Sequence, residues 1–165
     1  MEALCRLSYS GDAVDDTSRV RRFSIIALLL ALTACHGSAQ VLRLRTRHGE
    51  VTVLVTVADS QEERQRGLMS VDRLDGNEGM AFLFRRPTRG SFWMKDTLIP
   101  LSVAFWNRRH RIVEILDMDP CHSDPCPVYE PGASYVGALE VDQGFFRRNG
   151  VEIGDRVEFD QRVGI

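Results

Sequence analysis

Apolar and polar residues alternate along much of the chain beyond residue 40, which is the pattern of strands with one buried face. The segment 41–47 (VLRLRTR) alternates apolar and basic residues, and 50–57 (EVTVLVTV) is rich in β-branched residues. The His48-Gly49 turn signal between them predicts a hairpin. Further strands are expected at 80–84, 92–95, 101–106, 111–118, 135–141 and 156–160, with turns at 107–110 and 154–155 and a proline-rich loop at 119–133.

Two short helices interrupt this pattern. Ser60 and Glu63 have the spacing of a capping box, and Gly67 is placed to end a helix, so a helix is expected over 61–68. A second short helix is expected over 142–149, where it would end at Gly150. The pattern therefore predicts a mainly β fold, a compact sandwich or barrel with two short helices, in one domain over residues 41–165.

The part of the chain before residue 40 has a different pattern. An apolar run of 11 residues, 24–34 (SIIALLLALTA), follows Arg19, Arg21 and Arg22. A membrane-spanning helix needs about 20 apolar residues, whereas basic residues before a short run are typical of a signal peptide. We therefore expect residues 1–34 to be a signal peptide rather than a buried helix. Its mixed-charge start suggests a mis-assigned N-terminal extension, with translation starting at Val20.

The end of this run resembles the lipobox of bacterial lipoproteins, in the residues Leu32-Thr33-Ala34-Cys35. The resemblance implies that Cys35 is acylated and becomes the first residue of a lipid-anchored tether over 35–40. His36, which is not Asp, implies by the same resemblance sorting to the outer membrane. The alternative is ordinary secretion, with cleavage at Gly37-Ser38-Ala39. We expect a cell-envelope protein that faces the periplasm and has the membrane as a partner through its lipid.

Charge and cysteine content narrow the function further. The formal net charge of −2 argues against a protein that binds nucleic acid through bulk positive charge. Cys121 and Cys126 lie in a proline-rich segment, and an oxidising compartment favours a disulfide between them. The alternative is a soft-metal site with His122, although a structural zinc site takes four ligands. We expect the disulfide, and no metal or cofactor.

Several blocks resemble domain-of-unknown-function family 192, a bacterial and archaeal family. They are Arg66-Gly-Leu-Met69, Gly79–Phe84, Phe92-Trp-Met-Lys-Asp-Thr97, Pro100-Leu101, Tyr135–Glu140 and Gly150–Val157. Their order matches the family from about residue 41 to 160. The resemblance implies a small β-sandwich of jelly-roll character, and it supplies no activity. Gly137-Ala138 and the turn at 107–110 depart from the expected pattern.

Candidate site residues concentrate in the most distinctive block. Lys95 is the single lysine beside 20 arginines, so a special role for its compact charge is weighed against chance. Such a role could be a tight pair with Glu140 or Asp96. Glu140 is itself expected to be a partly buried carboxylate balanced by Lys95 or Arg66. An aromatic face with a few polar groups is what a small-ligand site requires. The proposed lining is Arg66, Trp93, Lys95, Asp96 and Thr97, with Glu140 as a further candidate.

Catalytic signatures are sparse, because no nucleophile elbow, zinc-protease helix or phosphate-binding loop is present. The first hypothesis is therefore a non-catalytic module that binds a small molecule, an envelope component or a partner. The alternative is a hydrolytic enzyme that acts on cell-envelope material, with Glu140 and Asp96 as acid and base. A structural factor without a small-molecule site is a third hypothesis.

Overall fold

A computed structural model describes residues 40–159 of the chain, and the expected leader, Cys35 and most of the tether lie outside them. The strands are β1 (Gln40–Thr46), β2 (Gly49–Ala58), β3 (Glu78–Thr88), β4 (Phe92–Trp93), β5 (Leu101–Trp106), β6 (Ile112–Met118), β7 (Val128–Tyr129), β8 (Tyr135–Asp142) and β9 (Arg156–Phe159). The helices are α1 (Gln61–Arg66) and α2 (Phe145–Arg148). The predicted mainly β fold with two short helices is confirmed.

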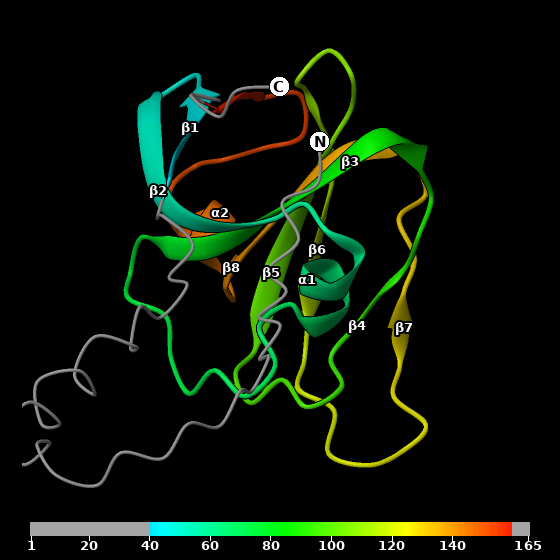
Figure 1. Cartoon of the computed structure of the whole chain (residues 1–165). Coiled ribbons are helices and arrows are strands. Elements are labelled where there is room, and N and C mark those ends of the chain that lie inside the picture. The colour runs from blue at the N-terminus through cyan, green and yellow to red at the C-terminus, as the bar shows by residue number, and fades with distance from the viewer. Residues whose placement is uncertain (1–39, 160–165) are drawn as a thin grey trace, which may run out of the picture. The chain divides into compact units, whose positions relative to one another are not determined.

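Seven strands form one strongly curled sheet, a half-barrel, in the order β6-β5-β8-β3-β2-β1-β9 (Figure 1). Neighbouring strands are antiparallel except β2 and β3, which are parallel and are connected through α1. The curl brings the two edge strands together at one end, where Arg111 bridges Arg156 and the Val157 amide donates to the His110 carbonyl oxygen at 2.8 Å. The predicted β1–β2 hairpin is confirmed by its register, from Gln40 opposite Val55 to Thr46 opposite Gly49.

Helix α1 begins as its sequence predicts. Ser60 accepts a hydrogen bond from the Glu63 amide, the Glu63 carboxylate accepts one from the Ser60 amide, and Gly67 ends the helix with a positive φ of 49°. No residue of α1 is buried, so the helix depends on this cap and on its contacts at the surface of the sheet. Helix α2 is shorter than the predicted 142–149, because β8 continues to Asp142 and Gly144 has a left-handed conformation with a φ of 79°.

The expectation of a strand-free loop over 119–133 is wrong in one place. Val128 and Tyr129 form β7, which pairs with β4 in a separate two-stranded ribbon, Phe92 opposite Tyr129 and Trp93 opposite Val128. A strand of two residues is too short to give a periodic signal, and prolines conceal it further. The disulfide between Cys121 and Cys126 is present in the structure, in the loop that leads to β7.

Each face of the sheet has its own hydrophobic core. The inner face of the curl is filled by residues of most sheet strands together with Phe145 and Phe146 of α2. The outer face is covered by Leu68, by Met94 and by the ring of Phe92, which pack on Phe82, Phe105 and Ala138. Side chains two residues apart along β8 share a face, so Glu140 lies on the outer face with Ala138.

Candidate functional site

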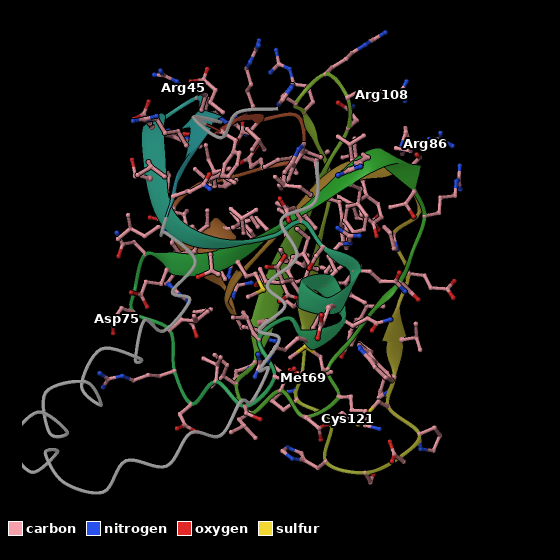
Figure 2. The ribbon with its side chains drawn as sticks, viewed as in Figure 1. Arg45, Met69, Asp75, Arg86, Arg108 and Cys121 are labelled. Atoms are coloured by element: carbon pink, nitrogen blue, oxygen red, sulfur yellow. A yellow bond between two sulfur atoms is a disulfide. The ribbon has the colours of Figure 1, made fainter. Side chains whose placement is uncertain are left out.

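A cavity of about 330 Å³ opens on the outer face of the sheet. Its walls come from three parts of the chain: α1 and the residues directly after it, the segment before and within β4, and the outer faces of β3 and β8. The lining residues used below are Arg64, Arg66, Met69, Phe82, Phe84, Phe92, Trp93, Thr97, Tyr135 and Glu140. Figure 2 labels Met69 in the chain that follows α1.

The walls are mainly aromatic. The Phe92 ring meets Phe82 edge-on at a centroid distance of 5.1 Å, and Tyr135 meets Phe84 edge-on at 5.3 Å. The Tyr135 hydroxyl donates to the Gly90 carbonyl oxygen at 2.7 Å, which ties the segment before β4 to the start of β8. Burial raises the pKa of Tyr135 to about 12, so this hydroxyl keeps its proton at neutral pH. The rings therefore form a fixed apolar wall.

Glu140 brings a carboxyl group into this apolar space. It lies in the middle of β8, opposite Met80 of β3 and Val103 of β5, and is only 5% exposed. Burial raises the pKa of Glu140 to about 8, so most of the carboxyl groups are protonated at neutral pH. Among the described residues the carboxyl group has no ion pair within 4.0 Å and no hydrogen bond.

The cations expected to pair with Glu140 therefore do not pair with it. Neither Lys95 nor Arg66 forms an ion pair with it, and Lys95 does not pair with Asp96. The Lys95 ammonium instead lies 5.7 Å from the centre of the Trp93 ring, in a cation–π contact. The half-exposed Trp93 side chain provides apolar support for the lysine at the surface, beside the cavity.

The structure gathers four of the six predicted ligand-binding residues around the cavity: Arg66, Trp93, Thr97 and Glu140. Lys95 and Asp96 are not among the lining residues. Asp96 contributes through its backbone, because its carbonyl oxygen accepts a 2.8 Å hydrogen bond from the Ser70 amide and its positive φ of 53° turns the chain. This bond joins the segment after α1 to the segment after β4, and Thr97 is buried next to it.

Sequence reasoning missed the rest of the wall. Phe82 and Phe84 alternate with Leu83 along β3, and that spacing indicates a shared face, but it does not distinguish a cavity wall from a filled core. Arg64 was also missed. Its guanidinium donates to the Leu83 carbonyl oxygen at 3.0 Å and lies 5.1 Å from the Phe84 ring centre. Arg66 is exposed and forms no hydrogen bond or ion pair with any residue in 40–159.

Two further features are absent from residues 40–159, a cluster of charged or sulfur metal ligands and a long apolar helix. No cluster of three potential His, Cys, Asp or Glu ligands occurs between residues 40 and 159. In the same range, neither helix has the length and hydropathy needed to cross a bilayer. Within this range, the chemistry of the cavity comes from one carboxyl group, two guanidinium groups, a few polar side chains and the aromatic walls.

Two solved structures have a fold similar to that of this chain. A proposed transcription regulator from Sinorhizobium meliloti 1021 is 29% identical with a TM-score of 0.69, over 74% of this chain and 94% of that one. A protein of unknown function from Novosphingobium aromaticivorans DSM 12444 is 28% identical with a TM-score of 0.67, over 72% and 83%.

No curated protein matches the chain. The family model of DUF192, described as "Uncharacterized ACR", matches residues 43–159, which include all the blocks that carry the resemblance in sequence. With most of its length matched by that model, the chain belongs to domain-of-unknown-function family 192.

Proposed function

We propose that the protein is a non-catalytic binding module whose ligand enters the cavity between α1 and the outer face of the sheet. The observation that carries this proposal is Glu140, a buried carboxyl group that lines the cavity and has no partner among residues 40–159. Its oxygens are not fully enclosed, so they face the space of the cavity. A ligand that enters the cavity can therefore supply the hydrogen bonds that the protein does not.

The size and composition of the cavity support a small-molecule ligand. Its volume of about 330 Å³ lies at the lower end of the range of small-molecule pockets, which is roughly 300–1,000 Å³. Aromatic walls with a few convergent polar groups are the usual lining of such pockets. The walls are also held in place, by the Tyr135–Gly90 hydrogen bond and by the backbone bond between Ser70 and Asp96.

The binding proposal is tested by a fragment screen on the purified full chain, read by two-dimensional NMR. We expect aromatic fragments to shift the amide signals of Gly67, Phe92 and Glu140, and to raise the melting temperature by mass action. The exposed Arg108, which lies far from Met69 in Figure 2, is the control site, and Arg108→Gln should keep the same fragments. Fragments that shift only signals outside the cavity, or no binding fragments, contradict the proposal.

The alternative hydrolytic function has less geometric support. It pairs Glu140 with Asp96 as acid and base, but Asp96 is exposed and does not line the cavity that contains Glu140. Asp142, two residues after Glu140 on β8, does not line the cavity and forms an ion pair with Arg148 at 2.7 Å. A single protonated carboxyl group can donate one proton, and hydrolysis of a glycosidic bond uses two carboxyl groups.

We also propose that the mature protein is a lipid-anchored component of the cell envelope. The signal-peptide pattern and the cysteine at its end support this location, and a disulfide between Cys121 and Cys126 is consistent with an oxidising compartment. Metabolic labelling with an azido fatty acid should tag the wild type and Cys5→Ser, and should fail on Cys35→Ser. Label that persists in Cys35→Ser, or an unlabelled wild type, contradicts the anchor.

A further inference from the structure

The cavity contains the Glu140 carboxyl group and the Arg66 guanidinium group at different depths, and neither group has a partner within the described residues. Glu140 is 5% exposed, so it lies at the buried end, whereas Arg66 is exposed and lines the same cavity. No ion pair or hydrogen bond in residues 40–159 involves either side chain. The aromatic rings of Phe82 and Phe92 lie among the same lining residues, and they provide the apolar wall of the site.

The buried end is defined by Gly67 as well as by Glu140. A Cβ atom at Gly67 would meet the Phe82 ring at 3.5 Å and Oε2 of Glu140 at 4.0 Å. The carboxyl oxygen and the ring edge therefore face the same point beneath the end of α1. A ligand atom that reaches this point contacts a hydrogen-bonding oxygen and an aromatic ring together.

Resting on the proposed function, we propose that the ligand is a small amphoteric molecule with an amine directed at Glu140, an apolar body against the aromatic wall and an anionic group held by Arg66. A bound ammonium group favours the ionised form of Glu140, which releases its proton to solvent. The ammonium then supplies the hydrogen-bond donors that the carboxylate lacks, in a site where low dielectric strengthens the attraction. Arg66 offers a planar guanidinium that matches a carboxylate or phosphate group.

Other ligand classes satisfy only part of this site. A simple cation is repelled by the positive charges of Arg64 and Arg66, which both line the cavity. A simple anion is attracted by these arginines but brings no donor to Glu140. A neutral apolar molecule fills the aromatic part and leaves both charged groups without partners, which forfeits the energy of pairing them. Only a molecule that carries both kinds of group pairs with both ends.

Four probes with the same benzene skeleton test this inference by calorimetric titration of the purified full chain. They are 4-(aminomethyl)benzoate, which has both groups, 4-methylbenzylamine, 4-methylbenzoate and the neutral 4-methylbenzyl alcohol. We expect the amphoteric probe to bind at least about tenfold more tightly than each of the others, a difference that corresponds to about 1.4 kcal/mol.

Two variants assign the two ends. Glu140→Gln should reduce the affinity of the amphoteric probe to that of 4-methylbenzoate, and Arg66→Gln should reduce it to that of 4-methylbenzylamine. Arg66 is exposed, so its variant keeps the test valid if Glu140→Gln fails to fold. The matched controls Glu62→Gln on α1 and Arg108→Gln alter exposed charges outside the lining and should leave all four affinities unchanged.

Two results overturn the inference and separate it from the proposed function. If the neutral probe binds as tightly as the amphoteric one, the cavity binds ligands but not through its charged ends, so only this inference is wrong. If none of the four probes binds at millimolar concentration, the inference is also wrong, and the fragment screen described above then decides the proposed function independently.

Discussion

Two buried polar side chains on opposite faces of the curled sheet differ in their hydrogen bonding. On the inner face, the buried Ser102 hydroxyl donates to the Asp117 carboxylate and accepts from the Gly144 amide at 2.8 Å, so its hydrogen bonds are complete. On the outer face, Glu140 is 5% exposed and has no partner in the part of the chain that the structure describes. The difference indicates that the position of Ser102 adds stability, whereas the position of Glu140 gives up stability to present a binding group.

The largest effect is expected from Phe146→Ala in the inner core. Phe146 is 2% exposed and meets Phe145 edge-on at 5.8 Å. Truncation of a buried Phe costs about 3–5 kcal/mol, because it removes apolar contacts and leaves a cavity. Urea denaturation should show this loss, while the protein that remains folded keeps its affinity for the ligand of the outer cavity. Lost affinity with unchanged stability would invert the roles assigned to the two faces.

The second prediction concerns pH and the outer face. Burial raises the pKa of Glu140 in the folded state from 4.5 to about 8, so above pH 4.5 the folded state binds more protons than the unfolded state. The contribution of Glu140 to stability is therefore complete below pH 4.5 and is lost as pH rises to about 8, by at most about 1.4 kcal/mol per pH unit. The unfolding free energy of the wild type, measured relative to Glu140→Gln, should fall across this range.

The difference between the two proteins isolates Glu140. Every other residue is identical in both proteins, so the contributions of the other groups cancel in the subtraction. A second control is Glu114→Gln, since Glu114 accepts a hydrogen bond from the Gly132 amide on another part of the molecule. If the wild type and Glu140→Gln show parallel pH profiles, the carboxyl group is not desolvated as the structure indicates.

The third prediction returns to the inner face, at a position where the family pattern favours a bulkier residue. A Cβ atom at Gly137 would lie 2.0 Å from Cζ2 of Trp106, so the buried indole rests directly on the glycine backbone. Gly137→Ala should cost about 1–3 kcal/mol of unfolding free energy through overpacking. Adding Trp106→Leu should restore part of that loss. An unchanged stability in Gly137→Ala would mean that the indole does not occupy this place.

The alternation of residues predicted most of the sheet, because each of its long strands has a buried side. It also predicted α1, because the capping box of Ser60 and Glu63 is a local signal. The parallel pairing of β2 and β3 and the ribbon partner β7 were not predictable in the same way. These pairings join segments that are distant in sequence, and no local pattern of side chains records them.

The candidate site was predicted in part for a similar reason. Arg66, Trp93, Thr97 and Glu140 could be identified because they lie in distinctive sequence blocks, and the structure places them around one cavity. The lack of an ion-pair partner for Glu140 could not be predicted, since the sequence offered Lys95 and Arg66 as nearby cations. In the structure neither cation pairs with the Glu140 carboxyl group, and the Lys95 ammonium lies over the Trp93 ring instead.

The smallest effect is expected at the edge of the cavity, in Ser60→Ala. The Ser60 side chain caps α1, and loss of an N-cap costs about 1 kcal/mol. Since no residue of α1 is buried, the loss should be local. Amide hydrogen exchange over residues 61–66 should accelerate, while the sheet strands β1 and β8 keep their protection. Ser60→Asp retains a capping oxygen and should exchange like the wild type. Equal acceleration in both variants would show that packing, rather than the cap, holds the helix that borders the cavity.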